Sequence, residues 1–196
     1  ITGTSVQVQT RSYENLSSLL KGFEDITASE EYAVAWLDLL SSRHPGRGVV
    51  RSASIDQHGQ AMAKPKRFNQ IRIPKPRNLN VVLPPICRSH NNLKYLMSSI
   101  SKDLRVTSIQ NYLFPLDRVR NWNHLYGKSG LIQWQFILPD KETSLLEEII
   151  MGFSKTSARP ALAVLKRCGE ASESYLSFCS PGWTLAIDLP ATQDSY

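Results

Sequence analysis

The stretch LIQWQFIL, residues 131–138, decides the fold, because polar and apolar side chains alternate along it. Side chains point to opposite faces along a β-strand, so Gln133 and Gln135 share one face, while Trp134 and Phe136 share the other. Three further patterned segments follow, in the order helix, strand, strand: 141–155, 161–167 and 183–189. This order of elements predicts a ferredoxin-like α+β unit.

The first half of the chain has the same outline. It contains a strand, an amphipathic helix and two further strands, at residues 5–11, 13–26, 32–40 and 49–55. The composition HPGRG at residues 44–48 predicts the turn between the last two strands. We therefore predict an α+β fold in which two such units share one mainly antiparallel sheet, with helices on one face.

The segment between the two halves carries the positive excess of the chain. Residues 57–102 contain nine Lys or Arg and no Asp or Glu. Residues 57–88 also contain five prolines without a sustained period, which predicts a mobile basic loop. Such a loop can attract phosphates, an anionic membrane surface or nucleic acid, or it can simply be solvated. Its one aromatic residue, Phe68, equips it poorly for stacking on single-stranded nucleic acid.

Three shorter elements are predicted after this loop. They are a helix at 91–101 with Leu93, Leu96, Met97 and Ile100 on one side, a strand at 107–114 and a helix at 116–126.

Several classes of site are missing from the sequence. Three cysteines without a CxxC pair, and four scattered histidines, argue against a disulfide framework and against a metal site. No G-x-S-x-G elbow and no glycine-rich phosphate loop occurs. No apolar run reaches the roughly 20 residues that span a bilayer. Reducing, cytoplasmic surroundings are the default expectation.

The polar face of the strand at 131–138 is the first candidate site. The amides of Gln133 and Gln135 can donate and accept hydrogen bonds to a flat polar ligand, although a face that only meets water is the plainer interpretation. Lys166, in the run AVLKR, can pair with a phosphate or a reduced flavin, or it can be a solvated surface lysine.

Three blocks of sequence carry a family resemblance: YLFPLDRVRNWNHLYGKSGLIQWQFILP at 112–139, ALAVLKRCG at 161–169 and LSFCSPGWTLAIDLP at 176–190. They resemble the C-terminal domain of FAD-linked oxidases of the decaprenylphosphoryl-β-D-ribose oxidase type, within the vanillyl-alcohol oxidase superfamily. The resemblance implies that residues 1–196 are a substrate-binding cap domain, with an FAD-binding domain preceding Ile1. The parent protein would then oxidise a sugar hydroxyl on a polyprenyl-phosphate ribose, and a partner reductase would complete the 2′-epimerisation.

The resemblance also assigns roles to individual residues. It places three side chains against the flavin and the substrate: Gln133, Gln135 and Lys166. It places three more in the substrate pocket: Trp36, Thr184 and Ala186. Mycobacterial members have Asn and Cys at the last two positions, so the substrate can differ here. Cys168 and Cys179, where the family has Phe and Pro, are interpreted as packing or loop changes and not as nucleophiles.

The family's candidate catalytic base has no counterpart before Tyr196. The chain alone is therefore expected neither to hold FAD tightly nor to turn over substrate. In the family, the region equivalent to the basic loop lies over the substrate entrance, which suits a lipid-linked sugar phosphate and a peripheral membrane contact. A related flavin oxidase of another alcohol or a sugar lactone is the alternative. From a different class, a ferredoxin-like nucleic-acid-binding module is also open, although we expect no nucleic acid because such a module needs exposed aromatics on its sheet.

Overall fold

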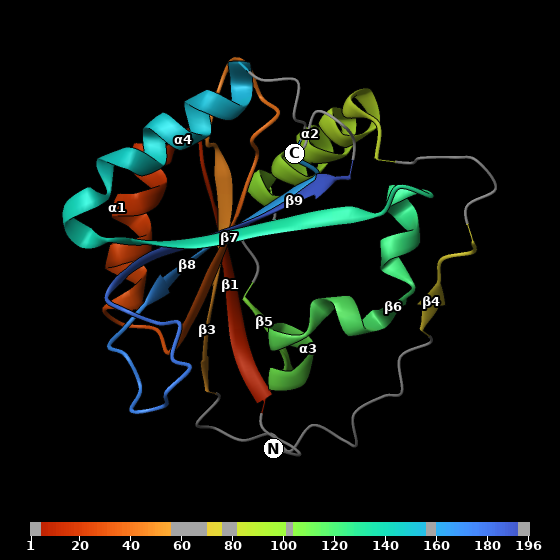
Figure 1. The fold of residues 1–196 in the computed structure, drawn as a ribbon. Coiled ribbons are helices and arrows are strands. Elements are labelled where there is room, and N and C mark those ends of the chain that lie inside the picture. The colour runs from red at the N-terminus through yellow and green to blue at the C-terminus, as the bar shows by residue number, and fades with distance from the viewer. Residues whose placement is uncertain (1–4, 56–69, 76–81, 101–103, 156–159, 192–196) are drawn as a thin grey trace.

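A computed structural model describes residues 5–55, 70–75, 82–100, 104–155 and 160–191. These residues form a seven-stranded antiparallel sheet in the order β5-β1-β3-β2-β8-β9-β7, with helices packed against it (Figure 1). The predicted α+β class with a mainly antiparallel sheet is confirmed.

The sheet is built from two β-α-β-β units of the same topology. The first comprises β1 (Ser5–Tyr13), α1 (Leu16–Thr27), β2 (Tyr32–Leu37) and β3 (Gly48–Ile55). The second comprises β7 (Leu131–Pro139), α4 (Ser144–Lys155), β8 (Leu162–Cys168) and β9 (Gly182–Pro190). In each unit the last strand lies between the other two, and the two units meet where β2 pairs with β8. This arrangement is the duplicated sheet that the sequence predicted.

Helices α1 and α4 cover one face of the sheet, which we call the back face. Asn15 caps α1 by accepting a hydrogen bond from the Ser18 backbone N–H at 2.9 Å, which satisfies one of the free donors of the first turn. The apolar sides of both helices pack on the strands in one core, and its largest fully buried side chains include Trp183, Phe23, Leu19, Leu146 and Ile150. Burial of this face is the main source of stability for the domain.

The segment between the two units differs from the sequence prediction in several places. Helix α2 runs over Pro84–Ile100, so residues 84–88 begin a helix and do not belong to the predicted loop. Ile71–Arg72 forms a short strand, β4, which pairs in parallel with β6 (Val119–Arg120). Two parts of the predicted loop, 57–69 and 76–81, lie outside the described residues.

The predicted strand at 107–114 is wrong beyond its first two residues. Strand β5 covers Arg105–Ser108, and the Ser108 hydroxyl then accepts a hydrogen bond from the Asn111 N–H at 3.3 Å, which caps helix α3 (Ile109–Leu113). A side-chain cap of this kind begins a helix where hydrophobicity alone suggests a strand.

The predicted helix at 116–126 is also wrong. Two 3₁₀ turns, η1 (Pro115–Arg118) and η2 (Trp122–Tyr126), lie on either side of β6. Asn121 separates β6 from η2 in the left-handed conformation, with φ of 59°, which stops a continuous helix. A third 3₁₀ turn, η3 (Asp140–Glu142), precedes α4.

Helices α2 and α3 lie over the opposite face of the sheet, which we call the front face (Figure 1). Tyr112 of α3 packs with Val6, Val8 and Ala53, and Lys94 of α2 lies over the ring of Trp36. The helices are therefore not confined to one face, because the segment between the units folds back over the first unit.

Candidate functional site

All six side chains singled out in the sequence lie on the front face. Strand register shows this, because residues opposite each other in an antiparallel pair project to the same face. Trp36 on β2 is opposite Val164, Val164 is opposite Ala186 on β9, and Ala186 is opposite Gln135 on β7. Lys166 lies two residues after Val164 on β8, so it projects to the same face, and it is opposite Thr184. The fold thus gathers residues from four neighbouring strands into one surface.

Two hydrogen bonds orient the glutamines of this surface. The Gln133 amide donates to Oδ1 of Asp188 at 2.8 Å, and the Gln135 amide donates to Oγ1 of Thr184 at 3.1 Å. Thr184 and Asp188 are buried, whereas both glutamines are exposed. The buried acceptors therefore fix the amide groups from below, while each glutamine keeps a carbonyl oxygen and a second N–H for a ligand.

Asp188 is a member of the site that the sequence prediction omitted. Burial raises the pKa of its carboxyl, and hydrogen bonds from Gln133 and Tyr126 partly offset this effect. The pKa of the Tyr126 phenol is in turn raised, first by burial and then by the charge of Asp188. The sequence did contain a signal for Asp188. It is two residues after Ala186 and four after Thr184, and alternate residues of a strand share one face.

Lys94 is the second omission, and it lies at the centre of the front face. Its ammonium nitrogen is 4.3 Å from the centroid of the Trp36 ring, within the range of a cation–π contact. Burial, and then the positive charge of Arg51, lower the pKa of Lys94 to about 8. The predicted pocket tryptophan therefore faces a lysine that sequence spacing did not connect with it.

A buried network fixes α2 in this position. The Asp38 carboxylate accepts two bonds from Arg47, at 2.7 and 2.9 Å, and one from the Asn91 amide at 2.9 Å. Arg47 also donates to Asn92. Because Asn91 lies one helical turn before Lys94, this anchor places the lysine over Trp36.

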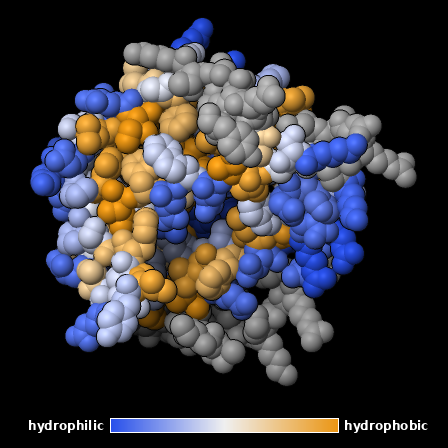
Figure 2. All heavy atoms as spheres, in the orientation of Figure 1, coloured by the Kyte–Doolittle hydropathy of each residue, from blue (hydrophilic) through white to orange (hydrophobic). Residues whose placement is uncertain are grey.

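The front face is hollowed beside these residues. Figure 2 shows a hollow in the middle of the molecule that is bordered by both hydrophilic and apolar residues. One groove, of about 540 Å³, lies between the first-unit strands, α2 and the α3–η1 segment, and its lining includes Arg51, Arg105 and Arg118.

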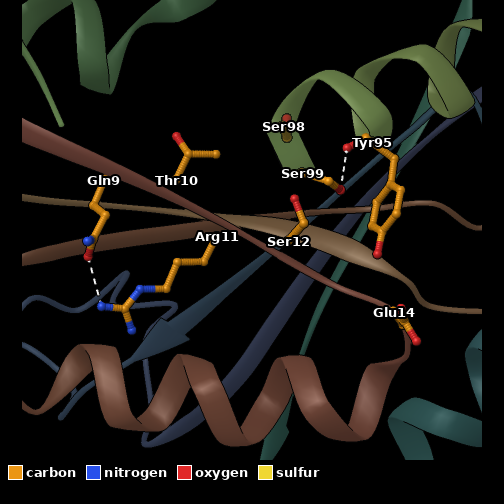
Figure 3. Close-up of a pocket in the computed structure, with 8 residues that line it drawn as sticks. All are labelled: Gln9, Thr10, Arg11, Ser12, Glu14, Tyr95, Ser98 and Ser99. Carbon is orange, nitrogen blue, oxygen red and sulfur yellow. Dashed lines mark hydrogen bonds between the residues drawn. The ribbon is translucent and has the colours of Figure 1, made fainter. Parts of the chain in front are cut away.

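A second pocket, of about 470 Å³, lies at the edge of β1 beside α2 (Figure 3). Thr10 and Ser12 point towards α2, whereas Gln9 and Arg11 point the other way, and Arg11 donates to Gln9 at 2.8 Å. Among the described residues, this pocket combines one arginine with Glu14 and five hydroxyl-bearing residues, and it contains neither of the two glutamines nor Lys166. We therefore place the candidate site on the front face and not in this pocket.

Other chemistry is limited within the described part of the chain. No cluster of His, Cys, Asp or Glu with the geometry of a metal site occurs there. Burial and a hydrogen bond with Cys179 raise the pKa of the Cys168 thiol, which disfavours the nucleophilic thiolate. None of the helices in the described ranges combines the length and the apolar character that a membrane crossing requires.

The fold and the front face together define a duplicated α+β domain with exposed polar side chains on one face of its sheet. No family model matches the sequence. The chain is similar to the decaprenylphosphoryl-β-D-ribose oxidase of Mycolicibacterium smegmatis, with 26% identity over 173 residues. That alignment covers 83% of this chain and 37% of the relative, so the chain spans little more than a third of the relative's length. The predicted resemblance is thus confirmed as a distant and partial one.

Proposed function

We propose that this chain forms the substrate-binding wall of an FAD-dependent oxidase that acts on a sugar hydroxyl, with a polyprenyl-phosphate ribose as the substrate. The observation that carries the proposal is that the exposed Gln133, Gln135 and Lys166 lie on one face of the second-unit strands, above the buried Thr184 and Asp188. The similarity to a decaprenylphosphoryl-β-D-ribose oxidase supports the same choice of reaction.

The chemistry of these side chains fits the edge of a flavin ring. That edge presents carbonyl oxygens and ring nitrogens, which call for N–H donors, acceptors and a cation. The two glutamines retain donors and acceptors, and the exposed Lys166 supplies the cation. A bound flavin supplies the hydride chemistry, while these residues orient the ring and the sugar.

The rest of the proposed enzyme lies outside this chain. We assign most of the FAD contacts to a domain before Ile1 and the catalytic base to a segment after Tyr196. A partner reductase and a cytoplasmic or peripheral membrane location belong to the same proposal. Thr184 is buried under Gln135 and Ala186 offers no polar group, which keeps another alcohol or a sugar lactone as the second candidate substrate.

The test uses the full-length protein that contains this chain. Purified protein should show flavin absorbance, and farnesylphosphoryl-ribose should bleach it under anaerobic conditions. Lys166→Met and Gln135→Leu should each lower the rate about 10- to 100-fold, as expected for the loss of a hydrogen bond to a charged group. Lys21→Met, on exposed α1 at the back face, is the matched control and should leave the rate unchanged.

Two results would contradict the proposal. One is full-length protein that contains no flavin when it is purified. The other is a Lys166→Met variant that oxidises the substrate as fast as Lys21→Met. A panel with a free polyol and a sugar lactone distinguishes the second candidate substrate. Residues 1–196 expressed alone should remain colourless.

A further inference from the structure

Helix α2 presents its apolar stripe to solvent and its polar stripe to the sheet. Four apolar side chains at helical spacing are exposed, with fractions of 56% for Leu93, 56% for Leu96, 62% for Met97 and 75% for Ile100. The side facing the sheet carries Asn91, Lys94, Tyr95 and Ser98 instead. Surface helices normally bury the apolar stripe, so the orientation of α2 is the reverse of the usual one.

Further exposed apolar side chains lie on β5 and α3, which line the groove together with α2. Leu113 and Phe114, at the end of α3, are 42% and 55% exposed. Val106 of β5 is 51% exposed, but it is opposite Gln7 and therefore projects to the back face. The apolar surface beside the groove is thus mainly the stripe of α2, and exposed apolar patches of this kind often mark interaction sites.

The groove described above lies beside this stripe and is basic. Arg51, Arg105 and Arg118 line it together with Ser98 and Asn111, and none of its described lining residues carries a carboxylate. Met97 belongs both to the groove and to the apolar stripe. Positive charge and exposed apolar surface therefore meet along one side of α2.

Arg51 is held in place before any ligand arrives. The Tyr112 hydroxyl donates to the Arg51 carbonyl oxygen at 2.8 Å, and the Arg51 guanidinium carbon is 5.5 Å from the centroid of the Tyr112 ring. The hydrogen bond holds the Tyr112 ring against the strand, and the ring contact in turn restricts the Arg51 guanidinium before a phosphate binds.

We propose that the groove binds the phosphate group of a lipid phosphate, with the hydrocarbon chain lying along the exposed apolar stripe of α2. Charge complementarity favours this occupant, because the arginines suit a phosphate and the adjacent stripe suits a hydrocarbon chain. The inference rests on the proposed function in one respect, since it assigns the phosphate and the lipid of the same substrate. Strand β3, which carries Arg51, is two strands from β8, which carries Lys166, a separation of about 10 Å. One lipid-linked sugar phosphate can therefore contact both.

The experiment measures binding to residues 1–196 through tryptophan fluorescence and calorimetry. The probes are farnesyl phosphate below its micelle concentration, farnesol, which lacks the phosphate, and ribose 5-phosphate, which lacks the lipid. Farnesyl phosphate should bind at least about tenfold more tightly than either of the others, because it alone uses both surfaces.

Variants localise the site. Arg51→Gln and Arg105→Gln should each weaken farnesyl phosphate about tenfold, and Met97→Gln should weaken it while leaving ribose 5-phosphate unchanged. Arg11→Gln is the matched control, since Arg11 lies on the same sheet but projects to the back face. Urea midpoints for each variant separate lost binding from lost folding, and Arg105, which is exposed, remains informative if Arg51→Gln does not fold.

Three outcomes would overturn the inference. They are equal binding of farnesyl phosphate and ribose 5-phosphate, equal binding of farnesyl phosphate and farnesol, and unchanged binding in both arginine variants. None of these measurements needs a flavin or turnover. A chain that binds farnesyl phosphate while its full-length protein oxidises nothing would contradict the proposed function alone.

Discussion

The charged ammonium group of Lys94 should lower the free energy of unfolding at neutral pH, and comparison with Lys94→Met should measure by how much. Its ammonium group is half-buried against Trp36, and burial followed by the charge of Arg51 lowers its pKa from 10.5 to about 8. In the unfolded chain the pKa returns to its ordinary value. Between pH 8 and 10.5 the unfolded state therefore binds more protons, so the stability of the wild type rises with pH across that window.

The magnitude follows from the pKa difference. One pKa unit corresponds to about 1.4 kcal/mol. For a folded pKa of about 8, raising the pH from 7 to 9.5 should stabilise the wild type relative to Lys94→Met by about 1–2 kcal/mol, where the lower figure allows for solvent screening of the half-buried charge. At pH 7 the variant avoids the cost of burying the ammonium group, but it loses a cation–π contact worth about 1 kcal/mol.

Urea unfolding of both proteins at pH 7, 8 and 9.5 measures this difference directly. Taking the difference between the two proteins cancels the ionisation of tyrosines and other lysines in the same pH range. Lys21→Met, on an exposed position of α1, is the control for removing a lysine that no neighbouring helix covers. The reasoning is refuted if Lys94→Met shows a constant difference from the wild type at every pH, because the Lys94 ammonium would then be as well solvated as that of Lys21.

Two further substitutions test how the site is built. Asp38→Ala should cost about 3–5 kcal/mol in urea unfolding, because it leaves the guanidinium of Arg47 buried without its carboxylate, and Asp38→Asn should cost less. A smaller loss for the Ala variant than for the Asn variant would contradict the network described above. Gly182→Ala should cost about 2–3 kcal/mol, because its φ is 152° and a Cβ there would lie 2.1 Å from the Leu138 carbonyl oxygen. Gly169→Ala, where a Cβ meets nothing within 4 Å, is the control, and equal losses at the two glycines would rule out the steric argument.

The sequence predicted best the parts of the fold whose pattern is complete within one element. The alternation of Gln133, Trp134, Gln135 and Phe136 predicted a strand and also the face to which each side chain projects, because successive side chains of a strand point to opposite faces. The pairing of Lys166 with Thr184 was not predicted, because it depends on the register between β8 and β9, which only the structure gives.

The prediction failed where a contact between distant segments decides the structure. The apolar residues of α2 predicted a helix, but their spacing says nothing about whether the stripe faces the core. That is decided by Asp38, which binds Asn91 from 53 positions away in the chain. The position of Lys94 over Trp36 depends on the same contact, and so no local pattern could have added it to the site.

The candidate site lies where the two β-α-β-β units differ. The two β-α-β-β units are equivalent on the back face, where α1 and α4 each cover one unit. On the front face the segment between the units covers the first unit with α2 and α3, while the second unit keeps its polar row exposed. Trp36 lies at the seam where β2 meets β8, directly under Lys94. A ligand bound there would contact strands of the second unit on one side and the inserted helices on the other, so the candidate site needs both halves of the chain.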